Sequence, residues 1–208
     1  MKLLFCDEQR MFVDGITSLL LSEPFIEYVE CVSTIEQSLQ IIKNNSYDIF
    51  ILNIEPSFID LLDYCSLIKS TTPDVKILIL SISNDVEIIQ KSRALAVNGF
   101  LQKNASIDEL ITALKTIKFG VDFYPSEFTT VLNNNFQTSL KSKDLFKKLT
   151  SREFEVLDLI LESKSNREIS EHLFLSVHTV NNHRKNIFKK LNVNNVICLT
   201  KLVLGNRQ

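Results

Sequence analysis

The sequence predicts an α/β domain followed by a smaller all-α domain. The first 120 residues alternate short apolar runs with amphipathic stretches, as repeated strand-helix units do, whereas the pattern after residue 148 is helical throughout. The two parts also differ in charge. Residues 1–144 contain 12 Lys and Arg against 19 Asp and Glu, a net charge of −7, and residues 145–208 contain 11 against 6, a net charge of +5. A basic module suggests a polyanionic partner such as nucleic acid, although many solvated helical surfaces are equally basic.

Five apolar runs, nearly continuous in Val, Ile, Leu and Phe, are typical of parallel strands covered on both faces. These runs lie at residues 2–6, 25–32, 48–53, 76–81 and 99–102. The amphipathic stretches that follow them predict helices at residues 11–21, 34–44, 59–70, 86–94 and 107–119. Ser106 and Glu109 form a capping-box pair at the start of the last helix. This order predicts a doubly wound five-stranded parallel sheet, with a ligand site at the carboxyl ends of its strands.

The composition indicates a globular protein, with 45% hydrophobic residues and only 4 Gly and 4 Pro. No apolar run approaches the roughly 20 residues that span a bilayer, and acidic residues interrupt any signal peptide. We therefore expect a cytoplasmic protein without membrane contact. The cysteines show neither a CxxC pair nor a Cys/His cluster, so we expect buried, reduced thiols rather than a metal site or a disulfide framework; they are Cys6, Cys31, Cys65 and Cys198.

The stretch between the two predicted domains is irregular. It contains Pro125, an Asn triplet at residues 133–135 and a polar run at residues 139–143. This pattern predicts one short helix and then a flexible linker. The predicted domains are therefore residues 1–120 and 149–208, joined by residues 121–148.

The C-terminal domain carries a dense series of motifs. LTSRE, VLDLI, SNREIS, HLFLSVHTVNNHRKNI and KKL follow one another between residues 149 and 193. Two further capping boxes, Thr150 with Glu153 and Ser165 with Glu168, mark helix starts 15 residues apart. The series resembles the LuxR-type helix-turn-helix. The resemblance implies a four-helix domain with a scaffold helix at residues 166–173, a turn at Phe174 and Leu175, and a recognition helix that enters the major groove of double-stranded DNA.

The recognition helix has an apolar and a polar side. Stepping 100° per residue from Val180 places one set of side chains within about 80° of it, namely Val177, Arg184, Ile187, Phe188 and Leu191. Only Arg184 is polar on this side. A second set lies between about 100° and 200° and consists of His178, Asn181, Asn182, Lys185 and Lys189. Val180 therefore marks the side that faces the core.

The polar side can read DNA. The amides of Asn181 and Asn182 can pair with adenine edges, and Lys185 can reach guanine acceptors or phosphate. The resemblance places base contacts at these three positions. Residues nearer the sugar-phosphate backbone position the helix rather than specify sequence, and we expect Ser176, Thr179 and His183 among them. The alternative is a merely solvated polar face, which every amphipathic helix has.

The last predicted helix, residues 195–204, places Val196, Leu199 and Val203 on one stripe. The resemblance assigns this helix to contacts between two copies of the chain on DNA. Packing within the domain is the alternative. A homodimer would suit an operator with two similar half-sites.

Residues 1–120 resemble the receiver domain of response regulators, which is flavodoxin-like, and the whole chain resembles the NarL/FixJ group. That family needs an acidic pair for Mg²⁺ after the first strand, an aspartate nucleophile ending the third strand, a Ser or Thr ending the fourth and a Lys ending the fifth. Four matching residues are present, namely Asp7, Glu8, Ser81 and Lys103. The position of the nucleophile is occupied by Asn53. An amide cannot form an acyl phosphate, so we expect a degenerate acceptor pocket.

Neighbouring residues do not replace the missing carboxylate. Pro56 lies three residues beyond Asn53, whereas the family places it four beyond the aspartate, and a one-residue shift would put Leu52 at the site. Asp48 begins the strand at the wrong end of the sheet, and two further acidic residues lie in the next helix, Asp60 and Asp63. Without the third carboxylate we expect weak Mg²⁺ affinity at most, no bound metal and no cofactor.

Phe100 stands where the family carries an aromatic switch residue. A buried core position is the alternative.

These observations favour a sequence-specific DNA-binding transcription regulator that acts without aspartyl phosphorylation, with its receiver serving for dimerisation or partner docking. The resemblance places such receiver contacts on the fourth helix, fifth strand and fifth helix. The alternatives are an interaction module that captures another regulator or a kinase, and a phospho-switched regulator with an unrecognised acceptor. The sequence does not support an enzymatic function, because it shows no metal-ligand cluster, Gly-rich phosphate loop or catalytic-triad spacing.

Overall fold

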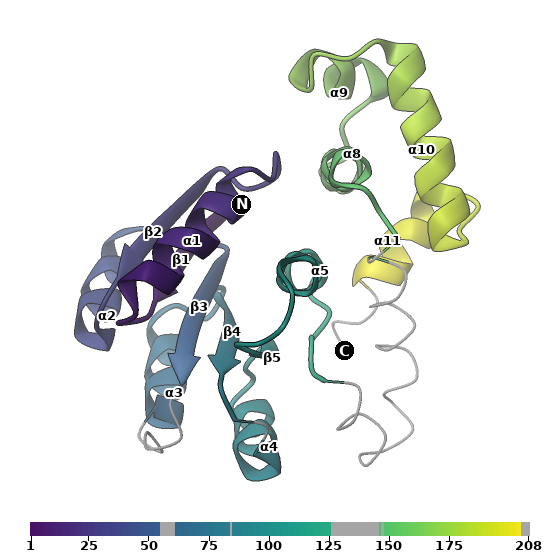
Figure 1. Ribbon diagram of the computed structural model, residues 1–208. Helices are drawn as coiled ribbons and strands as arrows, with labels where there is room; N and C mark the ends of the chain where they lie inside the picture. The colour runs from purple at the N-terminus through teal and green to yellow at the C-terminus, as the bar shows by residue number, and fades with distance from the viewer. Residues whose placement is uncertain (55–60, 84, 126–145, 147, 205–208) are drawn as a thin grey trace.

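The N-terminal half of the protein is built around one parallel sheet. A computed structural model of the chain describes residues 1–54, 61–83, 85–125, 146 and 148–204 (Figure 1). The strands lie in the order β2-β1-β3-β4-β5, and every pairing is parallel. Their bounds are β1 Lys2–Cys6, β2 Tyr28–Val32, β3 Ile49–Ile54, β4 Lys76–Ser81 and β5 Gly99–Gln102. The predicted doubly wound sheet is confirmed.

Helices cover both faces of this sheet and alternate with the strands along the chain. Their bounds are α1 Arg10–Leu21, α2 Ile35–Asn44, α3 Leu61–Thr71, α4 Val86–Ala94 and α5 Ile107–Lys118. Because successive strand residues point to opposite faces, Phe5 packs in the cluster that includes α1 and α5, whereas Leu4 packs in the cluster that includes α2, α3 and α4. Phe100 is fully buried in the second cluster.

The second strand is shorter than predicted. Phe25 and Ile26 precede β2, although both are buried. Phe25 is buried for another reason: its ring packs against Phe154 of the C-terminal domain, with centroids 4.9 Å apart. An apolar run in the sequence can therefore indicate residues that pack against another domain, and not only residues of a strand.

The N-terminal domain continues past residue 120. Val121, Phe123 and Tyr124 are buried, and the backbone N–H of Phe100 donates to Phe123 O at 2.7 Å. The short helix and linker predicted within residues 121–148 lie largely outside the described residues, as do Pro56 and Asp60.

The C-terminal domain consists of helices in the described part of the chain. Their bounds are α8 Ser151–Leu161, α9 Asn166–His172, α10 Val177–Leu191 and α11 Val196–Leu204. The recognition helix α10 packs against α8 and α9. Both predicted capping boxes of this domain are present, at Thr150 and at Ser165. At Ser106 only the bond from the Glu109 backbone N–H to the Ser106 hydroxyl is present. In the described residues, no helix is long and apolar enough to cross a membrane.

The cysteine prediction was wrong in part. All four thiols are free, but only Cys6 and Cys65 are buried, whereas Cys31 and Cys198 are exposed. Cys31 lies on β2, an edge strand whose residues are only partly covered.

Candidate functional site

The residues predicted to form the degenerate acceptor pocket gather at the carboxyl edge of the sheet. Since β3 lies between β1 and β4, its last two residues, Asn53 and Ile54, are flanked by Asp7, which follows β1, and by Ser81, which closes β4. Lys103 follows β5 and donates its backbone N–H to Ser81 O at 2.8 Å. The fold thus brings these four side chains to one edge, while Glu8 beside them is exposed.

Asp7 and Lys103 form a buried ion pair. Lys103 Nζ lies 2.7 Å from Asp7 Oδ2, and the two side chains are 8% and 0% exposed. This contact lacks hydrogen-bond alignment, so Oδ2 has no hydrogen bond among the described residues and the attraction is one of charge. Asp7 Oδ1 accepts the backbone N–H of Gln9 at 3.0 Å. Lys103 also lies 4.9 Å from the centroid of the Phe12 ring. The Asp7 charge is therefore balanced within the protein.

Asn53 supplies an amide where the family has a nucleophile. Its side chain is half-buried, and Oδ1 finds no hydrogen-bond partner in the described part of the chain. Ser81 is fully buried, and its hydroxyl accepts the backbone N–H of Ser83 at 3.1 Å. Among the residues that the structure describes, the pocket has a hydroxyl and an amine, and β3 itself contributes no carboxylate.

The donor set does not fit the Mg²⁺ ion that this fold family implies. Mg²⁺ needs octahedral oxygen ligands, with carboxylates supplying the charge. Asp7 is already paired with Lys103, and Asn53 contributes a neutral amide. Of the described residues at this edge, Glu8 is the remaining carboxylate, and it is exposed. Among the residues that the structure describes, no group of three His, Cys, Asp or Glu side chains is placed to hold a metal ion.

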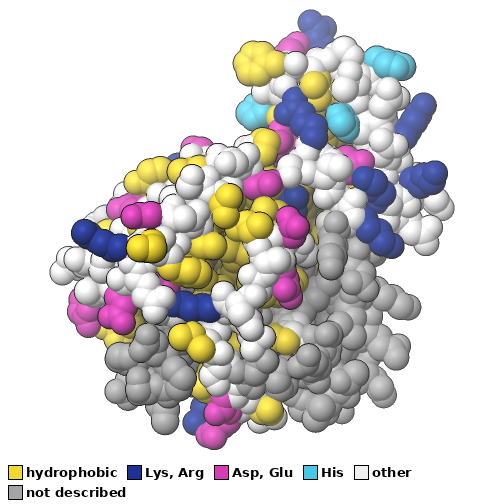
Figure 2. Space-filling view, viewed as in Figure 1, with side chains coloured by type: hydrophobic (Ala, Val, Ile, Leu, Met, Phe, Trp, Pro, Cys, Tyr) yellow, Lys and Arg dark blue, Asp and Glu magenta, His cyan; other side chains and the backbone are white. Residues whose placement is uncertain are grey.

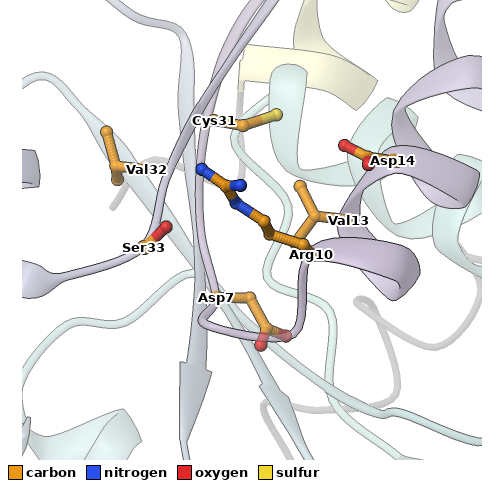
Figure 3. Close-up of a pocket in the computed structure, with 7 residues that line it drawn as sticks. All are labelled: Asp7, Arg10, Val13, Asp14, Cys31, Val32 and Ser33. Atoms are coloured by element: carbon orange, nitrogen blue, oxygen red, sulfur yellow. The ribbon is translucent and has the colours of Figure 1, made fainter.

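A pocket of about 290 Å³ opens beside Asp7, between the start of α1 and the end of β2 (Figure 3). The Arg10 guanidinium extends from α1 across the pocket towards β2, and Asp14 lies on the α1 side. The lining brings together opposite charges and an exposed thiol; it consists of Asp7, Arg10, Val13, Asp14, Cys31, Val32 and Ser33. Asn53 does not line it, so this space is separate from the position of the missing nucleophile.

The recognition helix α10 is held firmly at both ends. At its start the Ser176 hydroxyl accepts the backbone N–H of Thr179 at 3.0 Å. At its end Asn192 adopts a left-handed conformation with φ 53°, which Asn tolerates better than most residues. Val180, Ile187 and Leu191 are buried, in agreement with the predicted apolar side.

Two positions of the predicted apolar side differ from expectation. Val177 is 44% exposed, because it occupies the first turn of α10, where the helix projects beyond the core. Arg184 is half-buried, with its guanidinium carbon 5.8 Å from the centroid of the Phe188 ring. Burial lowers the pKa of this guanidinium. Arg184 thus covers Phe188 with its side chain, as long cationic side chains often do.

The predicted DNA-contacting residues are accessible to different degrees. Five are exposed, namely Ser176, His178, Asn182, Lys185 and Lys189, and three are half-buried, namely Thr179, Asn181 and His183. The amide oxygen of Asn181 already has a partner within the domain, because Oδ1 accepts a hydrogen bond from Asn166 Nδ2 at 2.7 Å. An amide needs both its oxygen and its nitrogen for a bidentate adenine contact. Asn182 is therefore the better placed of the two amides.

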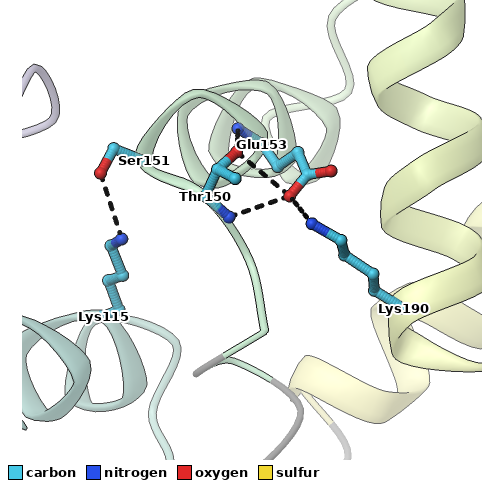
Figure 4. A network of polar contacts seen from close by, with 5 residues as sticks. All are labelled: Lys115, Thr150, Ser151, Glu153 and Lys190. Carbon is cyan, nitrogen blue, oxygen red and sulfur yellow. Dashed lines mark hydrogen bonds and ion pairs between the residues drawn. The ribbon is translucent and has the colours of Figure 1, made fainter.

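A polar network joins α8 to the recognition helix (Figure 4). Glu153 Oε2 accepts the Thr150 backbone N–H at 2.9 Å and the Lys190 ammonium at 2.6 Å. Burial raises the pKa of Glu153, but the hydrogen bonds from Lys190 and Thr150 outweigh it and lower the pKa overall. Lys115, from the receiver side, donates to the Ser151 hydroxyl at 3.4 Å.

Some residues that hold the helix-turn-helix in shape were not predicted from the sequence. Arg152 donates to the Leu173 carbonyl at 2.5 Å and pairs with Glu155 at the same distance, which ties α8 to the turn after α9. The LTSRE motif contains Arg152, but a motif alone does not reveal which distant carbonyl the side chain reaches. Asn166 was assigned only to the scaffold helix, and its hydrogen bond to Asn181 joins residues 15 positions apart.

The last helix, α11, uses its predicted stripe for packing. Leu199 and Val203 are fully buried within the domain, and Val196 is half-buried. Ile197, outside the stripe, is 68% exposed. The packing alternative therefore holds for the buried stripe, and a second copy of the chain could reach only the other side of α11.

Comparison with known proteins agrees with this two-part architecture. Residues 3–115 match the model of the response regulator receiver domain, and residues 147–203 match that of the bacterial regulatory proteins of the luxR family. A receiver followed by this helix-turn-helix defines a DNA-binding transcriptional response regulator. Members of this class are transcription regulators rather than enzymes.

Similar proteins extend over nearly the whole chain. The oxygen regulatory protein NreC of Staphylococcus carnosus is 30% identical over 200 residues, which cover 93% of this chain and 92% of NreC. The transcriptional regulatory protein DegU of Brevibacillus brevis is 30% identical over 210 residues, covering 93% and 88%. A structure of RcsB from Salmonella enterica serovar Typhimurium, bound to promoter rprA with the phosphomimetic BeF3-, shares the fold with a TM-score of 0.55, 21% identity and 100% coverage of both chains. The chain belongs to the receiver and LuxR-type response regulators of the NarL/FixJ group.

Proposed function

We propose that this chain is a sequence-specific regulator of transcription that binds its operator without aspartyl phosphorylation, and that its receiver serves for dimerisation or partner docking. The observation that carries the proposal is the amide of Asn53 at the end of β3. The remaining acidic residue of the buried pocket, Asp7, is neutralised by Lys103 at 2.7 Å. Among the described residues, no carboxylate at this edge combines burial with a free charge, which supports the absence of a nucleophile and of a metal site.

The proposed DNA contacts follow from exposure and chemistry. Asn182 presents an unbound amide for an adenine edge, and Lys185 presents an exposed ammonium for guanine or phosphate. Lys189 continues this face one turn further along α10 and is suited to phosphate. The RcsB structure with promoter DNA supports the same use of the fold. We expect double-stranded DNA to be bound by a homodimer, because cyclic dimers match operators with two half-sites.

The first test is phosphate uptake. Purified protein is incubated with a small phosphodonor and Mg²⁺, and intact mass is measured for wild type and for Asn53→Asp, with a conventional receiver as the positive control for the donor. We expect no uptake by wild type and one phosphoryl group on Asn53→Asp, because that substitution restores the missing carboxylate. A phosphoryl group on wild type would reveal an unrecognised acceptor and overturn the proposal.

The second test is DNA binding by the same samples. A duplex is selected from random-sequence DNA by the unmodified chain, and its affinity is measured by gel shift with and without the phosphodonor. We expect the same affinity in both conditions for wild type. A chain that selects no duplex but retains another regulator or a kinase would instead be an interaction module.

A further inference from the structure

The receiver and the DNA-binding domain share one continuous hydrophobic core. Phe154 of α8 is fully buried between two receiver rings, with centroids 4.9 Å from Phe25 and 4.9 Å from Phe119. Phe119 also stacks on Phe146 at 5.2 Å. Phe25 precedes β2 and Phe119 follows α5, so α8 docks on the face formed by the α1 side of the sheet and the end of α5. Separating the domains would expose all of these rings to water.

A buried lysine closes the same interface. Lys115 of α5 is 5% exposed, and its ammonium lies 4.8 Å from the Phe25 centroid and 5.4 Å from the Phe154 centroid. It donates to the Ser151 hydroxyl, which in turn donates to Glu23 of the receiver. The cation therefore lies between one aromatic ring from each domain, and both domains are needed to complete its surroundings.

An ion pair marks a second point of the interface. Lys118 Nζ lies 3.1 Å from Asp158 Oδ2 of α8, with side chains 21% and 31% exposed. The interface thus combines apolar, cation-π and charged contacts along both α5 and α8.

The docked arrangement leaves the recognition face uncovered. In Figure 1, α8 lies between the receiver and α10, and α10 is on the far side of α8 from the sheet. The core-facing side chains of α10 belong to the packing with α8 and α9. Asn182, Lys185 and Lys189 are exposed while the domains are docked. In Figure 2 Lys and Arg side chains gather on this outer part of the molecule, away from the receiver.

We infer that the docked form is the DNA-binding form, and that the receiver is a permanent structural support for α8 rather than a cover that a signal removes. The inference deepens the proposed function and rests on it, because a regulator without an acceptor at Asn53 has no phosphorylation step to separate the domains. The interface covers Lys115 and Lys118 of α5 and the adjoining Phe119, so a second receiver would have to pair without this part of α5.

A covalent tether across the interface tests this inference in the full chain. Glu23 and Ser151, whose side chains are hydrogen-bonded, are replaced by Cys and joined by a short bismaleimide. The exposed Cys31 and Cys198 are first replaced by Ser so that they do not react. Each single-Cys variant, labelled with a monofunctional maleimide, is the matched control for the chemistry.

We expect efficient cross-linking and an affinity for the selected duplex within about threefold of the single-Cys controls. Failure of the two thiols to cross-link, although each reacts alone, would show that the domains are apart in solution and overturn the inference. A loss of affinity of about tenfold or more in the cross-linked chain would show that the domains must separate to bind DNA, with the same consequence.

A second variant examines the opposite change. Phe25→Ala weakens docking from the receiver side without altering the DNA-binding domain, and we expect it not to raise DNA affinity. An increase of about tenfold or more would identify docking as inhibitory and overturn the inference. If Phe25→Ala does not fold, as its melting curve will show, the cross-linking result decides.

The two proposals fail in different ways. Loss of binding in the cross-linked chain alone, measured without phosphodonor, contradicts the docked DNA-binding form and leaves phosphorylation independence intact. Binding by the unmodified chain that requires phosphodonor contradicts the proposed function instead.

Discussion

Replacing Glu153 by Gln removes the charge that ties α8 to the recognition helix. Glu153 is 3% exposed, caps α8 through the backbone N–H of Thr150, and accepts the Lys190 ammonium at 2.6 Å. A Gln side chain keeps an oxygen that can accept the Thr150 N–H, so the substitution removes the charge and not the capping bond. Breaking a fully buried ion pair costs about 3–5 kcal/mol, but the Lys190 side chain is 33% exposed, which reduces this contribution to about 1 kcal/mol. We therefore expect Glu153→Gln to lower the free energy of unfolding by about 1 kcal/mol.

Urea and thermal unfolding of the full chain measure this loss. At pH 7, a change of about 1 kcal/mol corresponds to a melting temperature lower by roughly 2–4 °C in a chain of this size. The pKa of Glu153 is lowered from its ordinary 4.5 by folding. Its ionised form therefore stabilises the fold fully above pH 4.5, and this contribution is lost as the pH falls through the lowered pKa. The difference between Glu153→Gln and wild type should shrink over that acidic range.

A double-mutant cycle with Lys190→Met isolates the pair. If Glu153 and Lys190 act together, Lys190→Met destabilises wild type more than it destabilises Glu153→Gln, by about 1 kcal/mol. Equal effects in the two backgrounds would refute the assigned coupling. A destabilisation by Glu153→Gln that stays constant down to the lowest pH would refute the electrostatic part of the reasoning.

Four further predictions test separate features of the molecule. Asn182→Ala should weaken operator binding by about 1–3 kcal/mol and relax specificity at one base pair, which selection of duplexes by the variant would show. Phe174 is 95% exposed with φ 54°, so Phe174→Asn should stabilise the fold in urea by about 1 kcal/mol. A Cβ at Gly99 would lie 2.6 Å and 2.9 Å from two buried side chains, so Gly99→Ala should destabilise by about 1–3 kcal/mol on the same assay. Cys31 should react rapidly with a maleimide, whereas Cys6 should stay protected in the folded chain, because burial raises its pKa to about 12; equal labelling rates in mass spectrometry would contradict this.

The sheet could be predicted because its signals are local. The apolar runs at β1, β4 and β5 end where the strands end, because the chain leaves the hydrophobic core where it leaves the sheet. The second strand was predicted too long because burial, and not pairing, explains Phe25. The hydrophobic pattern of the sequence predicts that a side chain is buried, but not whether it packs within its own domain or against the other domain.

The interface between the domains could not be predicted, because its contacts join residues far apart in the sequence. Lys115 reads as an ordinary solvated lysine on an amphipathic helix, yet it is 5% exposed against α8. Phe154 is indistinguishable in the sequence from a residue of its own domain core. Likewise, the hydrogen bond from Asn166 that occupies part of Asn181 is visible only once both helices are placed.

The charge balance of the acceptor pocket explains how the fold tolerates its missing aspartate. A second carboxylate at the end of β3, beside Asp7, would leave two negative charges facing the single ammonium of Lys103 in a buried site, and burial of an unpaired charge is costly unless a cation joins it. With the neutral amide of Asn53 in that place, Asp7 and Lys103 balance one another at 2.7 Å without a metal ion. Asp7 Oδ2 lies against the Lys103 ammonium, and the other atom at this edge without a hydrogen bond among the described residues is an amide oxygen, Asn53 Oδ1, whose desolvation costs far less than that of a charge. This charge balance agrees with the proposed function, in which Asn53 removes the nucleophile and Asp7 needs no metal ion to balance its charge.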